Sequence, residues 1–143
     1  MDISEITQIR SECAHLLVAF GQFRDDRDSD GAASVMAPDG VWDRDGTELK
    51  GPEQVRKAVD QLRHETVLRH VLTNVLVDVI DSTHAKARAY YTVFRHDGPA
   101  GTALPLPRPL SGPTRMGDYE AKFVKLPEGW RISYAVAKRV FSN

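Results

Sequence analysis

His70 is the residue whose type and position in the sequence best suit proton-transfer chemistry. The segment from Arg69 to Asp81 has a period of two, which predicts a strand with His70, Leu72 and Asn74 on one face. An imidazole buried among leucines costs about 1–3 kcal/mol unless a polar group faces it. Imidazole also titrates near neutral pH, so it can accept and donate a proton. The pattern predicts a histidine that meets a polar partner in an apolar setting.

Other residue patterns argue against several kinds of chemistry. Cys13 is the single cysteine, so the chain forms no internal disulfide and no cysteine-based zinc site. His15 and His64 have no second histidine at ligand spacing, and the aspartates between Asp25 and Asp30 lack the glycine and terminal glutamate of a calcium loop. The sequence contains neither a glycine-rich phosphate loop nor a Gly-x-Ser-x-Gly motif. We therefore expect no metal, no cofactor and no serine nucleophile.

The composition is that of one globular domain. The chain has 143 residues, of which 41% are hydrophobic and 27% charged, and we assign residues 1–143 to a single domain. A net charge of −1 provides no broad basic field, which argues against nucleic acid as a partner. No apolar stretch is long enough to cross a membrane, and the first residues do not resemble a signal peptide. We expect a cytoplasmic protein with no membrane partner.

Hydrophobic periodicity predicts helices first and strands afterwards. Apolar residues at three- and four-residue steps predict a helix over the first 23 residues, and Asp28 or Ser29 would begin a short second one. Pro38-Asp39-Gly40 predicts a turn, and a helix should begin at Pro52. The expected strands are Val41–Asp43, Thr47–Lys50, Arg69–Asp81, Ala85–His96, Arg115–Leu126 and Trp130–Phe141.

This order predicts an α+β fold in which helices cover one face of a curved, mostly antiparallel sheet. The Arg69–Asp81 strand is apolar on both faces, so we expect a second subunit to cover the outer sheet face in a homodimer. The proline-rich connection 98–113 is long for a loop in a compact domain. The sequence leaves open whether this loop closes over a pocket or reaches a neighbouring subunit.

The inward-facing sets of the strands predict a pocket for a small hydrophobic ligand. His70 and Asn74 would share it with Arg115 and Tyr119, and Trp42 would lie at its edge. A mainly apolar, aromatic cavity with few polar groups is typical of small-molecule sites. Core packing for Trp42 and Tyr119, and an ion pair at the surface for Arg115, are the alternative interpretations.

Five stretches of the sequence resemble the SnoaL-like branch of the nuclear transport factor two-like superfamily. They are Phe20–Asp28, Ala37–Trp42, Leu49–Glu53, Arg69–Asn74 and Gly129–Ile132. The resemblance covers almost the whole chain and implies a cone-shaped, cystatin-like α+β domain with a deep pocket, commonly dimeric. Proteins of this superfamily include dehydratases, steroid isomerases, polyketide cyclases, small subunits of ring-hydroxylating dioxygenases and non-catalytic binders, so the likeness predicts fold better than activity.

The dehydratase branch resembles this sequence most. In that branch an aspartate just after the first helix orients a strand histidine, which acts as general acid and base. Asp25 and His70 occupy the matching positions. His96 falls near the position of a second pocket histidine, but strand alternation puts it on the face of Tyr90, Thr92 and Phe94, so a bulge would be needed to turn it inward. The sequence departs from the family where a first-helix tyrosine is replaced by Phe20 and a nearby acid by Gln22.

The resulting hypothesis is a cofactor-independent dehydratase or isomerase for a small apolar cyclic, aromatic, polyketide or steroid-like metabolite. Its catalytic residues would be His70 and Asp25, and its substrate-binding residues Tyr119, Asn74, Trp42, Arg115 and His96. The alternative is a non-catalytic binding protein or accessory subunit that uses the same pocket. Contact between Asp25 and His70 beside open volume would favour the enzyme.

Overall fold

The computed structural model describes residues 1–143 and contains three helices, α1 (Ile3–Asp25), α2 (Ser29–Ser34) and α3 (Gly51–Asp60). A capping box begins α1, in which the Asp2 side chain accepts from the Glu5 N–H and the Glu5 side chain accepts from the Asp2 N–H. Asp28 caps α2 through the Gly31 N–H. These caps satisfy donors that the helix backbones leave free.

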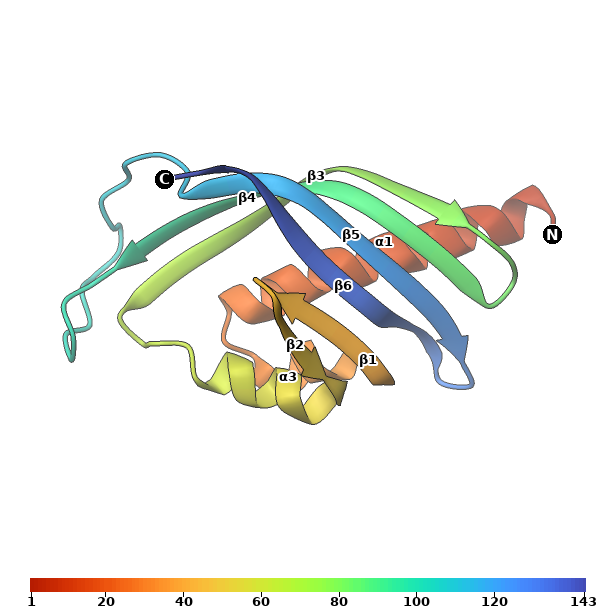
Figure 1. Ribbon diagram of the computed structural model, residues 1–143, viewed down its shortest axis with the longest axis horizontal. Coiled ribbons are helices and arrows are strands. Elements are labelled where there is room, and N and C mark those ends of the chain that lie inside the picture. The colour runs from red at the N-terminus through yellow and green to blue at the C-terminus, as the bar shows by residue number, and fades with distance from the viewer.

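Six strands form one sheet. They are β1 (Met36–Arg44), β2 (Thr47–Lys50), β3 (Thr66–Val79), β4 (His84–Asp97), β5 (Arg115–Leu126) and β6 (Gly129–Ser142). The strand order is β2-β1-β6-β5-β4-β3, and every neighbouring pair is antiparallel except β1 with β6. The four long strands arch over the rest of the molecule, with α1, α3, β1 and β2 inside the curve (Figure 1). The predicted α+β fold with a curved, mostly antiparallel sheet is confirmed.

The core fills the space between the sheet and α1. Leu17 and Phe20 of α1 are fully buried together with Phe123 and Ile132 of the sheet. Phe20 meets Trp42 of β1 edge to face, with ring centroids 5.1 Å apart. Packing of this kind fixes the end of α1 against the sheet.

The turn predicted at Pro38-Asp39-Gly40 is wrong, because these residues lie within β1. The pairing of β1 with β6 shifts between Met36 and Val41, so the segment is an irregularity in a strand. Proline has no N–H to donate to the ladder, and such residues are tolerated in strands at bulges. A side chain at Gly40 would meet the Ile132 carbonyl oxygen at 2.7 Å, so the two strands approach too closely for any other residue.

A bulge in β3 changes which residues face inward. Asn74 has φ +53°, in the left-handed region that asparagine tolerates better than most residues, and the register with β4 shifts between Thr73 and Leu76. Leu72 packs against the core before the bulge and Val75 after it, so the alternation loses its phase. Leu76 is left 55% exposed as a result.

The proline-rich connection 98–113 lies against the ends of β3 and β4. Arg108 Nη1 donates to the Glu65 carbonyl oxygen (2.9 Å) and lies 3.2 Å from His96 Nδ1. The Gly101 N–H donates to Glu65 Oε1 at 2.7 Å. None of the residues 98–113 lines the cavity on the inner side of the sheet that is described below.

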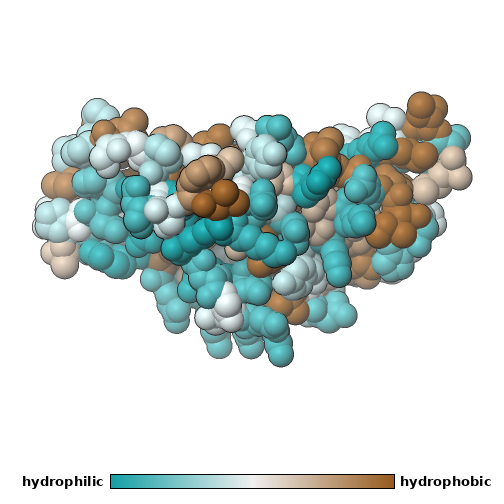
Figure 2. All heavy atoms as spheres, turned by 45° about the horizontal axis from the view of Figure 1, so that its top comes forward, coloured by the Kyte–Doolittle hydropathy of each residue, from teal (hydrophilic) through white to brown (hydrophobic).

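The surface is mostly hydrophilic with separate apolar patches. Figure 2 shows apolar atoms gathered at the end of the molecule where the N-terminus and the end of β3 lie. Ile3 and Ile80 are among the exposed large apolar residues. The three helices include none with both the length and the apolar character needed to cross a bilayer.

Candidate functional site

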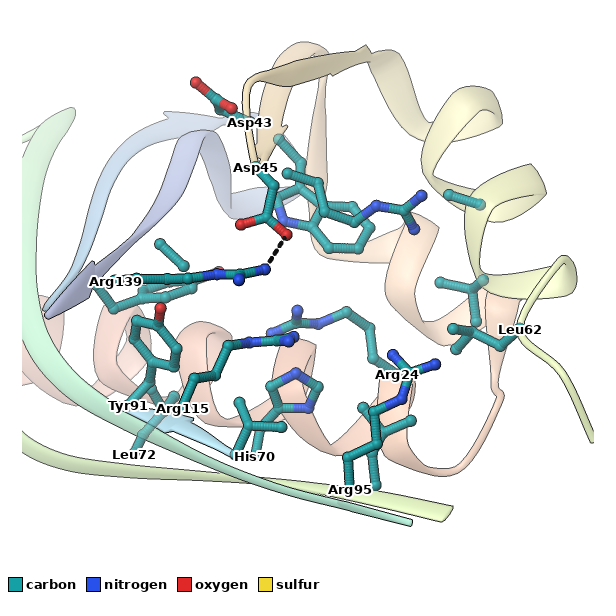
Figure 3. A pocket seen from close by; sticks show the side chains of 18 residues that line it. Arg24, Asp43, Asp45, Leu62, His70, Leu72, Tyr91, Arg95, Arg115 and Arg139 are labelled. Carbon is teal, nitrogen blue, oxygen red and sulfur yellow. Dashed lines mark hydrogen bonds and ion pairs between the residues drawn. The ribbon is translucent and has the colours of Figure 1, made fainter. Parts of the chain in front are cut away.

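A cavity of about 370 Å³ lies on the inner side of the sheet, a size typical of small-molecule sites. Its walls come from β3, β4, β5 and β6, from the end of β1, and from α3 and the last turn of α1. Figure 3 shows the side chains of the 18 residues that line it, and 10 of these are hydrophobic. The sheet and the helices therefore enclose a partly apolar space.

The structure brings His70 and Asp25 into direct contact. His70 Nδ1 lies 2.6 Å from Asp25 Oδ1, and the His70 backbone N–H donates to Asp25 Oδ2 at 2.9 Å. Because a carboxylate only accepts hydrogen bonds, Nδ1 carries the ring proton and donates it. One carboxylate thus holds both the backbone and the ring of His70, and the position of Asp25 as the last residue of α1 places it there.

The second ring nitrogen of His70, Nε2, is the one available for chemistry. It has no hydrogen-bond partner in the protein, and His70 lines the cavity whereas Asp25 does not. Burial lowers the pKa of His70 below its ordinary 6.5, and the nearby Arg24 charge lowers it further, although Asp25 opposes both. At neutral pH the imidazole is therefore uncharged, and Nε2 has a free lone pair that can accept a proton.

This arrangement predicts how His70 titrates. We expect its imidazole to protonate with a midpoint below pH 6.5, and replacement of Arg24 by Gln to raise that midpoint because a repelling charge is removed. NMR of the ring protons over a pH series measures both midpoints. Arg88→Gln removes an exposed charge on β4, outside the cavity, and should leave the titration unchanged. A wild-type midpoint at or above 6.5 would contradict the assignment.

Arg24 is a site residue that the sequence analysis missed. It is only 9% exposed, its guanidinium carbon lies 4.4 Å from the Phe20 ring centre and 5.0 Å from that of Trp42, and its Nε donates to the Phe20 carbonyl oxygen. Burial lowers its pKa, yet an arginine stays charged. One signal could have revealed it, since Arg24 follows Phe20 by four residues and so lies on the buried face of the helix.

Three of the predicted substrate-binding residues line the cavity. Trp42 and Tyr119 are buried, and Arg115 is half-buried. The Tyr119 hydroxyl is buried without a hydrogen-bond partner, and burial raises its pKa while the Arg24 charge opposes the rise. A phenol in this state is a protonated donor that a ligand oxygen would satisfy.

The other two predicted substrate-binding residues do not reach the cavity. Asn74 is exposed because the β3 bulge turns it away from the inner face. His96 lies outside the cavity beside Arg108, while its neighbour Arg95 faces in. The expectation that both face the pocket is corrected, since it assumed an unbroken β3 for one residue and an inward turn of β4 for the other.

Arginines make up four of the six charged residues of the cavity wall that the sequence did not predict. Besides Arg24 and Arg115, three further arginines line it, together with two aspartates. They are Arg44, Arg95 and Arg139, with Asp43 and Asp45. These residues lie near strand ends and in the turn after β1, where alternation gives no reliable direction.

Solved structures of other proteins share this fold. An NTF2-like protein with a cystatin-like fold from Novosphingobium aromaticivorans is similar over 96% of this chain and 86% of its own, at 22% identity and a TM-score of 0.77. The hexachlorocyclohexane dehydrochlorinase LinA-type3 from Novosphingobium barchaimii is similar over 99% and 93%, at 14% identity and 0.78. ActVI-ORFA from Streptomyces coelicolor is similar over 93% and 98%, at 13% identity and 0.71.

Sequence comparison adds the family. No curated protein matches the chain. The SnoaL-like domain family matches residues 5–136, which include most of α1, all of α2, α3 and β1 to β5, and the first part of β6. The chain therefore belongs to the SnoaL-like domain family and has the cystatin-like, NTF2-like fold.

Proposed function

We propose that the protein is a cofactor-independent dehydratase or isomerase that acts by acid–base chemistry on a small cyclic metabolite. The observation that carries the proposal is the 2.6 Å contact of His70 Nδ1 with Asp25, which leaves Nε2 free beside a cavity of about 370 Å³. A positioned imidazole of lowered pKa is a base at neutral pH. Aromatic, polyketide-like or steroid-like rings would pack against the apolar wall.

The proposed dehydration begins with removal of a proton from the carbon next to a substrate carbonyl. Nε2 of His70 accepts this proton, and the electron pair of the broken C–H bond forms a carbon–carbon double bond as the β-hydroxyl departs. The imidazolium returns its proton to the departing hydroxyl, so water leaves and neutral His70 is restored. In an isomerisation the same proton returns to a different carbon of the substrate.

Neighbouring residues would assist the transfer. The Asp25 carboxylate stabilises the positive imidazolium and holds its orientation. The unpartnered Tyr119 hydroxyl is a donor for the carbonyl oxygen on which negative charge develops. The Trp42 indole forms part of the wall against which a ring packs.

The proposal is tested by a ligand screen followed by turnover. Cyclic β-hydroxyketones and enones are first screened for a rise in Tm, since a ligand that binds the native state stabilises it. Compounds that bind are then incubated with the protein, and products are identified by mass spectrometry and absorbance. Loss of water or migration of a double bond is expected. Binding without any conversion across the screen would favour the non-catalytic alternative.

We also propose that the protein forms a homodimer through the outer face of the sheet. Directly paired residues of neighbouring strands share a face, and the register places Val71, Thr92, Met116 and Phe141 in one row across β3, β4, β5 and β6. Val71 and Phe141 are exposed apolar residues in that row. An apolar row of this kind on an open sheet is suited to a second subunit.

Light scattering at micromolar concentration tests the dimer. We expect the mass of two chains for the wild type and of one chain for Phe141→Glu, since a charge buried at an apolar interface is strongly unfavourable. Phe141 is 67% exposed, so the substitution should not disturb the fold of the subunit. A single-chain mass for the wild type would overturn the proposal.

A further inference from the structure

The cavity concentrates positive charge in a chain that is slightly acidic overall. Five arginines and two aspartates line it, whereas the formal net charge of the chain is −1. Asp43 accepts from the Gly46 N–H at 2.9 Å within the turn, and Asp45 pairs with Arg139 at 3.0 Å. The five arginines outnumber these two carboxylates, so the cavity wall keeps an excess of positive charge.

Three of the five arginines have no carboxylate partner. Arg139 is paired with Asp45 and Arg95 with Asp97, but Arg24, Arg44 and Arg115 form no ion pair. Arg24 is the most demanding case, because it is nine-tenths buried and its surroundings supply aromatic faces and one backbone carbonyl. A buried cation without a counter-ion is costly to maintain.

Two of these unpaired guanidinium groups converge beside the base. Figure 3 shows the Arg24 and Arg115 side chains reaching into the cavity next to His70. Their charges lower the pKa of His70, and the Arg115 charge also acts on Arg24. Asp25 is the carboxylate whose charge acts on both Arg24 and His70, and each of its oxygens already accepts a hydrogen bond from His70. The space between the guanidinium groups is suited to an anion from outside the chain.

Apolar side chains line the cavity around these charged groups. Leu68, Leu72 and Val93 come from β3 and β4, and Val59 and Leu62 from α3 and the segment after it. A ligand that fills the cavity must therefore offer an apolar body and a negatively charged end. This adds a charged group to the mostly apolar ligand that the strand pattern alone predicts.

We infer that the substrate of this site is a cyclic carboxylate whose carboxylate group binds Arg24 and Arg115 while its ring packs against the apolar wall beside His70. The inference rests on the proposed acid–base function for the identity of the ligand as a substrate. Guanidinium groups bind carboxylates through charge-assisted, often bidentate, hydrogen bonds. A ring anchored in this way would present the same carbon to Nε2 in each encounter.

The experiment compares naphthoate with naphthamide, which share an aromatic body and differ in the charged group. Calorimetric titration of the wild type should give naphthoate at least about tenfold tighter binding, in line with the strength of charge-assisted hydrogen bonds. Arg115→Gln should reduce naphthoate affinity by about tenfold and leave naphthamide affinity nearly unchanged. Arg88→Gln removes the same charge from the outside of the sheet and should change neither.

Arg115 is the preferred variant, because it is half-buried and unpaired, so its replacement should preserve the fold. Arg24→Gln provides a second test if its folding is verified by circular dichroism. Equal affinity for acid and amide, or naphthoate binding that survives Arg115→Gln unchanged, would overturn the inference. Competition by inorganic phosphate but no preference for naphthoate would likewise overturn it, because the site would then bind free inorganic anions.

Repeating the titration with His70→Gln separates the two proposals. We expect this variant to keep its preference for naphthoate, since the guanidinium groups are unaltered. Binding of naphthoate by a protein that converts no compound, in a screen that includes β-hydroxyketones bearing a carboxylate, would support the carboxylate site and refute the acid–base function. Conversion of neutral ketones at rates that do not depend on Arg115 would support the function and refute the carboxylate substrate.

Discussion

Replacement of His70 by Gln is expected to lower kcat by about 10²–10⁴-fold, the usual contribution of a positioned acid–base group. Glutamine has a similar reach to the imidazole but cannot accept and return a proton near neutral pH. The measurement is steady-state kinetics on any compound that the wild type converts. KM should change much less than kcat, because the lost interaction forms in the transition state of proton transfer and not with the bound substrate in its ground state.

A matched substitution controls for the loss of a histidine as such. His15 is exposed on α1 and does not line the main cavity, so His15→Gln should retain wild-type kinetics. The Tm of His70→Gln should be reported beside the rates, to show that the protein remains folded. Activity within a few-fold of wild type in a folded His70→Gln protein would refute the assigned role.

Replacement of Phe20 by Ala is expected to lower the free energy of unfolding by about 3–5 kcal/mol, which is typical of a large aromatic side chain removed from a core. Phe20 is fully buried, packs edge to face on Trp42, and supports the Arg24 guanidinium on its ring. The substitution leaves a cavity at the end of α1 and removes one of the two aromatic surfaces that hold the arginine. Urea denaturation followed by tryptophan fluorescence measures the change.

Val18→Ala, on the same helix and half exposed, is the matched control and should stay within about 0.5 kcal/mol of wild type. If Phe20→Ala were no more destabilising than Val18→Ala, the packing described for the end of α1 would be incorrect. Naphthoate affinity should also fall in a folded Phe20→Ala protein, because the unsupported Arg24 can adopt other rotamers.

Much of the architecture could be predicted because hydrophobic period reports burial directly. The three- and four-residue steps in α1 and the two-residue steps in β3 to β6 arise from packing against one core. Asp28 as a helix cap and Pro52 in the first turn of α3 follow from local backbone chemistry, and the structure confirms both. Hydrophobic periodicity could not predict the contact between Asp25 and His70, because these residues are 45 positions apart in the chain. The family resemblance predicted it.

The errors occur where the backbone departs from regular geometry. Strict alternation in β3 assigned Asn74 to the pocket, whereas a bulge at that residue reverses the faces beyond it. Pro38, Asp39 and Gly40 are residue types common in turns. They lie within an extended strand because β1 pairs with β6 on both sides of them. Both cases need tertiary pairing that a single sequence does not contain.

The arginines of the cavity illustrate a different limit. Arg24 begins a run of mixed charges that is typical of a solvated link between helices. It is nevertheless buried, because Phe20 and Trp42 provide faces on which a guanidinium can stack. A hydropathy pattern assigns arginine to the solvent-exposed surface, because it contains no information about aromatic rings that pack on the guanidinium group. The strand pattern therefore predicted Arg115 but none of the other four arginines that line the cavity.

Because one carboxylate binds both the main chain and the ring of His70, the proposed chemistry would depend on how α1 packs against β3. Asp25 is the last residue of α1, and His70 lies in β3. Separation of this helix from this strand would therefore break both hydrogen bonds. The imidazole would then rotate freely and lose the tautomer that exposes its lone pair. The proposed proton transfer would thus require α1 to stay packed on β3, and agents that weaken this contact should abolish any turnover before they unfold the chain.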